Sequence, residues 1–206
     1  MNIKRAEYVV FDVETTGLNA EEGDRIVEIA AVRFKNNEIV DRFESLINPG
    51  FSIPQEAQAI NGITDDMLKT APTSDQVLPQ MIDFIAGGCL VGHNVRFDLG
   101  FLCYELSLLE RRVREATPAL DTLKIAKELL PYLKSYRLSN VALNLGIPVK
   151  ETHRAMPDVE LTARMLGRLL DMAEEQQMVD FSEFYKRFGV EKPNYKMSQG
   201  TQGMLF

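Results

Sequence analysis

The order of the apolar segments constrains the fold of this chain more than any other feature. Three β-prone runs come first, at Tyr8–Phe11, Arg25–Phe34 and Glu38–Ile47, and each is joined to the next by a short connection. Short connections favour antiparallel neighbours, so this part of the chain predicts a three-stranded meander.

After the meander, the spacing of apolar residues changes from that of strands to that of helices. Two short apolar runs, Cys89–Val91 and Ala119–Thr122, predict further strands. Apolar residues recur at helical spacing in segments near 77–85, 101–109, 125–130, 138–145, 158–175 and 181–188. We therefore expect an α/β fold with a mixed sheet, in which parallel strands extend the antiparallel meander and helices cover both faces.

Length and composition fit one globular domain followed by a tail. The chain has 206 residues, of which 45% are hydrophobic and 26% are charged. We expect the domain to span 1–188 and a flexible tail to span 189–206, where Pro and Gly recur without a periodic apolar face. No apolar run reaches the ~18 residues of a membrane span. No signal peptide is recognisable either, which predicts a cytoplasmic protein without a membrane partner.

The chain is acidic, with 30 acidic and 23 basic residues and a formal net charge of −7. Proteins that bind nucleic acid usually carry a basic surface, so this balance alone argues against such a partner. Some of the acids, however, occur where a metal site would need them, and they change this interpretation.

Two of these acids end the first β-prone run. Asp12 and Glu14 are separated by one residue, so their side chains point to the same face of a strand. Neighbouring carboxylates repel each other unless they share a cation, and Mg²⁺ prefers oxygen ligands. The pair therefore fits either a solvated strand end or part of a metal site.

Two further acids begin helices on the side that turns toward the core. Asp98 lies three residues before Phe101, at the start of an apolar stripe, and Asp158 lies four residues before Thr162 in the same way. Capping and the helix dipole explain an acid at a helix start, but not its inward position. Together with the strand pair, these acids predict one site of four carboxylates.

His153 is the expected proton acceptor at this site. It lies five residues before Asp158, on the loop that enters the last long helix. Imidazole exchanges protons near neutral pH, so a histidine beside a cluster of metal and carboxylates is a candidate general base. His93 follows a buried strand, and we expect it to be a hydrogen-bonding structural residue.

Three segments that contain these residues resemble the motifs of a known enzyme superfamily. They read FDVETTGL at 11–18, HNVRFD at 93–98 and HRAMPD at 153–158. In type and order they resemble the motifs of the DEDDh 3′–5′ exonucleases, and most closely those of the proofreading exonuclease (epsilon subunit) of bacterial DNA polymerase III and stand-alone relatives. The resemblance covers roughly 8–170 and implies a ribonuclease-H-like fold.

The resemblance also implies a role for each matched residue. Asp12, Glu14, Asp98 and Asp158 would bind two Mg²⁺ or Mn²⁺ ions, and His153 would take the proton from the attacking water. The residues implied to contact the terminal nucleotide are Thr15, Thr16, Gly17, Leu18, Asn61, Asn94 and Phe97. Asn61 departs from the family, which often carries His there. Two bound cations would reduce the formal charge to about −3, so acidity does not exclude a nuclease.

The substrate and the class of activity have alternatives. The first interpretation is a proofreading or repair exonuclease that acts on the single-stranded or frayed 3′ end of DNA, with a DNA polymerase as a partner. Because such motifs act on phosphate, an RNA 3′-end exonuclease of the same superfamily is the alternative. An inactive module that binds partners is the remaining one.

The end of the chain suggests a further partner. The sequence QGMLF at 202–206 resembles the bacterial pentapeptide that binds sliding clamps, in which Gln is followed by Leu-Phe. Gln202 would supply hydrogen bonds, while Leu205 and Phe206 would supply an apolar anchor. Gly203 departs from the Leu often found there, and the alternative is that the apolar pair folds back onto the domain.

Overall fold

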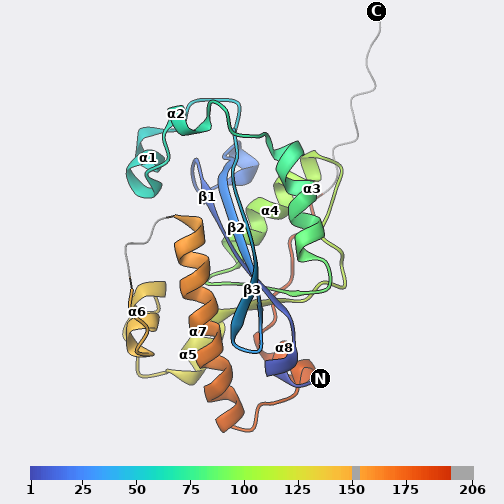
Figure 1. The fold of residues 1–206 in the computed structure, drawn as a ribbon, viewed down its shortest axis with the longest axis vertical. Coiled ribbons are helices and arrows are strands. Elements are labelled where there is room, and N and C mark those ends of the chain that lie inside the picture. The colour runs from blue at the N-terminus through green and yellow to red at the C-terminus, as the bar shows by residue number, and fades with distance from the viewer. Residues whose placement is uncertain (150–153, 196–206) are drawn as a thin grey trace, which may run out of the picture.

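A computed structural model describes residues 1–149 and 154–195 (Figure 1). Its centre is a five-stranded sheet in the order β3-β2-β1-β4-β5. The strands are β1 (Tyr8–Thr15), β2 (Ile26–Lys35), β3 (Glu38–Leu46), β4 (Cys89–Gly92) and β5 (Ala119–Asp121). β1 and β3 both pair antiparallel with β2, whereas β4 pairs parallel with β1 and with β5. The expected meander and mixed sheet are therefore confirmed.

Helices cover both faces of this sheet, as expected. The helices on one face are α5 (Thr122–Leu129), α6 (Leu138–Asn144), α7 (Ala155–Glu175) and α8 (Phe181–Phe188). The helices on the other face are α3 (Ser74–Ile85) and α4 (Arg96–Leu108). Each set encloses its own hydrophobic cluster against the sheet. None of the helices within the described ranges is long and apolar enough to cross a membrane.

Successive side chains of β1 point to opposite faces of the sheet and therefore pack against different helices. Tyr8 and Val10 are buried in the cluster on the α7 side, whereas Val9 is buried in the cluster on the α4 side. By the same alternation, Asp12 and Glu14 continue the row on the α7 side. The strand thus directs its two acids toward the start of α7.

Four short helices were not expected from the sequence. They are the 3₁₀ helices η1 (Ile3–Arg5) and η2 (Ala20–Glu22) and the α-helices α1 (Gln55–Asn61) and α2 (Asp65–Leu68). η1, η2 and α2 have four residues or fewer, and α1 buries only Ala57 among its apolar residues, so none of them shows a periodic apolar face. α1 and α2 instead contribute single side chains to a small cluster around Val27 of β2.

The first residues of the expected tail contact the domain. The Val190 N–H donates to the Ala119 carbonyl of β5 at 2.9 Å, and the Val190 side chain is buried. Lys192 Nζ donates to the Glu115 carbonyl at 3.1 Å. Residues 196–206, which include the QGMLF sequence, lie outside the described residues. A flexible tail that begins at 189 therefore stays a prediction, and packing continues past that position.

Candidate metal centre

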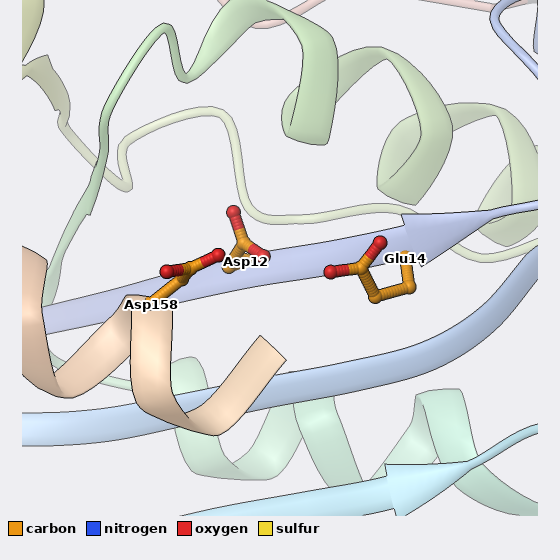
Figure 2. Close-up of side chains that lie close together, drawn as sticks. All are labelled: Asp12, Glu14 and Asp158. Carbon is orange, nitrogen blue, oxygen red and sulfur yellow. The ribbon is translucent and has the colours of Figure 1, made fainter. Parts of the chain in front are cut away.

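Three carboxylates from two elements converge beside β1 (Figure 2). Asp12 and Glu14 project from β1, and Asp158 projects from the first turn of α7. One oxygen of each residue lies within 4.8 Å of the other two. Two oxygen ligands of one Mg²⁺, each at about 2.1 Å, lie at most about 4.2 Å apart, so these oxygens are near the spacing that a shared cation requires. The structure therefore brings together three of the four acids that the sequence predicted.

Asp158 reaches the site because α7 is apolar on its inward face. Thr162, Met165 and Leu166 follow on that face and are buried against the sheet. The Asp158 N–H donates to the Arg154 carbonyl at 3.3 Å, at the start of the helical hydrogen-bond ladder. An acid that lies in the first turn of the helix, in line with this apolar stripe, points to the sheet and not to solvent.

Asp98 lies next to this group and approaches β1 from the start of α4, a helix that covers the other face of the sheet. It occupies the first turn of α4 and is only 4% exposed. Its Oδ1 accepts a hydrogen bond of 3.2 Å from the Val13 N–H, between Asp12 and Glu14. Asp98 therefore borders the cluster without belonging to the group of three oxygens.

The site is electrostatically unfavourable without a positive charge. Burial, followed by repulsion from Asp98 and Glu14, raises the pKa of Asp12 well above its usual value. Burial, followed by repulsion from Glu28 and Asp158, raises the pKa of Glu14 to about 7. Burial also raises the pKa of Asp98 to about 7, although backbone hydrogen bonds oppose the shift. A divalent cation would favour the charged forms, so this set of oxygen donors fits Mg²⁺ or Mn²⁺.

A further acid, which the sequence did not single out, holds the start of α7 against β2. Glu28 lies opposite Glu14 in the strand register and is 1% exposed. Its two oxygens accept hydrogen bonds of 3.0 Å from Arg154 Nε, and one of them accepts another from the Ala155 N–H at 3.0 Å. Because Arg154 and Ala155 begin α7, Glu28 helps to position Asp158. The available signal was a single acid inside the apolar run 26–34.

The loop after β1 holds its own hydrogen bonds and presents one apolar side chain. Thr15 Oγ1 donates to the Gly17 carbonyl at 2.6 Å. Thr16 is buried, and its hydroxyl contacts Asp24 Oδ1 at 3.2 Å. Leu18, in contrast, is 84% exposed. Of the expected substrate contacts in this loop, Leu18 is thus the side chain most available to a nucleotide.

The other expected substrate contacts have different environments. Asn61 is buried, and its Nδ2 reaches the Thr15 carbonyl at 3.5 Å, so it supports the loop after β1. Asn94 is exposed in the left-handed backbone region at φ 66°, and its N–H donates to Asp121 Oδ1 at 3.0 Å. The Phe97 ring is half-buried and lies 5.0 Å from the Phe101 ring. Binding of a nucleotide by these residues stays a prediction.

Of the two histidines, His93 is among the described residues and His153 is not. The role of His153 as the base therefore stays a prediction. His93 contacts the Thr122 hydroxyl through Nδ1 at 3.0 Å and the Tyr136 carbonyl through Nε2 at 2.7 Å. These contacts agree with the expected structural role of His93.

Comparison with known proteins finds relatives by sequence. The family model RNase_T, described as exonuclease, matches residues 9–166. The DNA polymerase III PolC-type of Clostridium perfringens (strain 13 / Type A) is 38% identical over 183 residues, which are 88% of this chain and 12% of that protein. The DNA polymerase III PolC-type of Bacillus subtilis (strain 168) is 37% identical over 187 residues, which are 91% of this chain and 13% of that protein. The chain thus spans only a small part of the length of these relatives.

Solved structures share the fold. A structure of Exonuclease X in complex with 5′ overhanging duplex DNA is 26% identical, with a TM-score of 0.65 over 82% of this chain and 93% of that chain. A structure of E. coli Exonuclease I in complex with a dT13 oligonucleotide is 19% identical, with a TM-score of 0.72 over 84% of this chain and 43% of that chain. The mixed sheet and its two helical layers are therefore an arrangement found in other exonuclease structures.

Proposed function

The chain belongs to the RNase_T exonuclease family, and from this we propose that it hydrolyses DNA from the 3′ end and releases nucleoside 5′-monophosphates. The observation that carries the proposal is the group of oxygens from Asp12, Glu14 and Asp158 within 4.8 Å of one another. DNA is favoured over RNA because the sequence relatives are DNA polymerases. RNA remains the alternative substrate.

The four acids are the proposed holders of two divalent cations, Mg²⁺ or Mn²⁺. When bound, these cations supply Lewis-acid chemistry, because they acidify water and stabilise negative charge on the leaving 3′ oxygen. Asp12, Glu14 and Asp158 supply converging oxygens, and Asp98 adds a buried carboxylate beside them. Bound cations would relieve the repulsion between these carboxylates, which favours cation binding at this position.

Other residues of the chain would position the substrate and move the proton. His153 would accept the proton of the attacking water as the new O–P bond forms and the bond from phosphorus to the 3′ oxygen breaks. Arg154, the next residue, is held by Glu28, which supports the backbone beside the proposed base. Leu18 and Phe97 would contact the terminal nucleotide with their exposed apolar atoms.

The proposal is tested with 5′-labelled single-stranded DNA, a mismatched primer-template and RNA, each with Mg²⁺ or Mn²⁺. We expect shortening from the 3′ end and 5′-monophosphate products. Asp158→Asn should lower the rate about 10³-fold or more, since losing a cation ligand costs several kcal/mol of stabilisation. Glu175→Gln is the matched control, because this exposed acid ends the same helix.

Each outcome of this assay decides between the interpretations. Near-normal turnover by Asp158→Asn would contradict the proposed cation site. Comparable rates on RNA and DNA would support the RNA 3′-end exonuclease. Absence of hydrolysis on every substrate by the wild-type chain would support the partner-binding module.

We also propose that the chain acts with a DNA polymerase in the cytoplasm and binds a bacterial sliding clamp through residues 202–206. Support comes from the similarity to DNA polymerase III PolC-type and from the QGMLF sequence. Gln202, Leu205 and Phe206 lie outside the described residues. The affinity of the full chain for a clamp should exceed that of a chain truncated after Gly200, and equal affinities would contradict the motif.

A further inference from the structure

The longest stretch of the sequence without an acid is 129–150, although the chain holds 30 acidic residues in 206. It contains the cations Lys134, Arg137 and Lys150. Its first part connects α5 to α6, and α6 packs beside α7, the helix that carries Asp158 (Figure 1). A local positive region therefore occurs within an acidic protein.

The connection between α5 and α6, residues 130–137, lies close to the acids of the metal centre. In the parallel pairing of β1 with β4, Val10 lies opposite Val91, so Asp12 and His93 are about level two residues further along. His93 Nε2 contacts the Tyr136 carbonyl at 2.7 Å. The backbone at Tyr136 is thus separated from Asp12 by one strand spacing and one histidine side chain.

The connection is anchored on one side and exposed on the other. The Tyr136 hydroxyl donates to the Leu130 carbonyl at 2.8 Å, and Leu133 packs against the core. Tyr132 is 70% exposed, and Lys134 is also exposed. Arg137, the residue that follows Tyr136, is exposed. Among the ion pairs of the described residues, none involves Lys134 or Arg137.

We propose that Tyr132, Lys134 and Arg137 form a strand-binding surface for the part of the substrate strand that lies 5′ of the nucleotide in the metal centre. The two cations would contact phosphates, and the tyrosine ring would stack on a base, as in other proteins that bind single strands. The inference rests on the proposed function. Cations in the metal centre would neutralise only the acids around the reacting phosphate. The rest of this acidic chain would repel the phosphates of the strand, so positive side chains are needed further along it.

The first test reverses the two charges with Lys134→Glu and Arg137→Glu in one chain. Affinity for a labelled thymidine oligonucleotide, measured by fluorescence anisotropy without divalent cations, should fall about tenfold or more. The slope of log affinity against log salt should become shallower by about 1.4, since each lost phosphate contact on a single strand contributes about 0.7. Hydrolysis of the p-nitrophenyl ester of thymidine 5′-monophosphate should stay unchanged, because this small substrate has no 5′ strand.

The matched control is Arg111→Glu with Arg112→Glu, which changes the net charge by the same amount. Both arginines are exposed and follow the C-terminal end of α4. α4 begins beside the metal centre, and its 13 residues place that end about 20 Å away. The control should leave the affinity within about twofold of wild type, because phosphate contacts act locally.

Tyr132 is tested separately by two substitutions. Tyr132→Ala should weaken oligonucleotide binding about fivefold or more, because stacking on one base is lost. Tyr132→Phe should restore binding, since it keeps the ring. Equal weakening by both substitutions would overturn the stacking contact.

The remaining outcomes separate this surface from the proposed function. Equal losses from both double charge reversals, or no loss from either, would overturn the surface. A parallel loss of ester hydrolysis in the Lys134 and Arg137 variant would also overturn it, because the damage would then lie in the metal centre. If the wild-type chain hydrolyses neither the oligonucleotide nor the ester, the proposed function is contradicted. Anisotropy still measures binding of the oligonucleotide, so the strand-binding surface is tested independently.

Discussion

At the scale of single residues, the acid that positions the site is distinct from the acids that would bind cations. Glu28 is almost fully buried, and its partner Arg154 keeps 41% of its side chain exposed. The bond between them ties β2 to the residue that follows His153. We therefore expect Glu28 to act on the proposed chemistry through the backbone at the start of α7.

Glu28→Gln should lower kcat about ten- to a hundredfold while the KM for an oligonucleotide changes little, because small misplacements of reacting groups are costly. The free energy of unfolding should fall by about 1–3 kcal/mol, since a charged hydrogen-bond partner is lost. Steady-state kinetics and urea denaturation measure the two effects. Glu160→Gln on α7 is the control, because it weakens ion pairs with the exposed side chains of Arg42 and Arg164. Equal kcat values for the two variants would contradict a positioning role.

Local periodicity predicts some site residues and not others. Asp12 and Glu14 could be assigned to one face from strand alternation, and Asp158 to the inward face from helical spacing. The role of Glu28 could not be predicted, because it depends on Arg154, which lies 126 positions away in the sequence. Only the docking of α7 on the sheet brings the two side chains together.

At the scale of elements, the loop after β1 is shaped by one close approach. A Cβ atom on Gly17 would stand 2.3 Å from the Asp24 carboxylate oxygens. That carboxylate accepts hydrogen bonds from Thr16 Oγ1 and from the Asn19 N–H. A side chain at position 17 would displace the group that holds the loop carrying Leu18.

Gly17→Ala should raise the KM for an oligonucleotide several-fold and lower the free energy of unfolding by about 1–2 kcal/mol, as the Asp24 hydrogen bonds are lost. The cost stays moderate because the carboxylate can swing aside. Gly100→Ala is the control, since a Cβ there meets no atom within 4 Å and lies inside α4. It should stabilise the chain by about 0.5–1 kcal/mol. An unchanged KM for Gly17→Ala would show that the loop does not depend on Asp24.

Elements with a clear apolar pattern could be predicted from the sequence, including the short strands β4 and β5, whereas elements without one could not. The long helix expected at 158–175 corresponds to α7, and the meander corresponds to β1, β2 and β3. α1 and α2 lack a detectable period, and their positions depend on apolar contacts with Val27 and the loop around Ile53. Such elements form because the sheet already offers a surface, so tertiary contacts decide them.

At the scale of the whole molecule, the position of each charge matters more than the total of −7. Acids gather at the end of β1, while 129–150 holds none. Composition could predict the sum but not this separation. The fold then places the two regions side by side, because the parallel pairing of β1 with β4 brings the His93 region beside Asp12, and His93 contacts Tyr136.

The buried acids also link cation binding to the stability of the fold. Without divalent cations, the pKa of Glu14 is raised from its usual 4.5 to about 7. Between these values the folded chain binds more protons than the unfolded chain, so the free energy of unfolding falls as pH rises through this window. Above about pH 7 the full penalty is present, and a cation that binds the charged carboxylates would remove it.

Mg²⁺ should therefore raise the melting temperature more at about pH 8 than at about pH 5.5, because protons already neutralise the site at the lower pH. Differential scanning fluorimetry in EDTA and in excess Mg²⁺ measures both shifts. Glu14→Gln should be more stable than wild type in EDTA at the higher pH, since it removes one repelling charge, and its response to Mg²⁺ should be smaller. A Mg²⁺ shift that is equal at the two pH values, or equal in wild type and Glu14→Gln, would show that these carboxylates do not hold the cation.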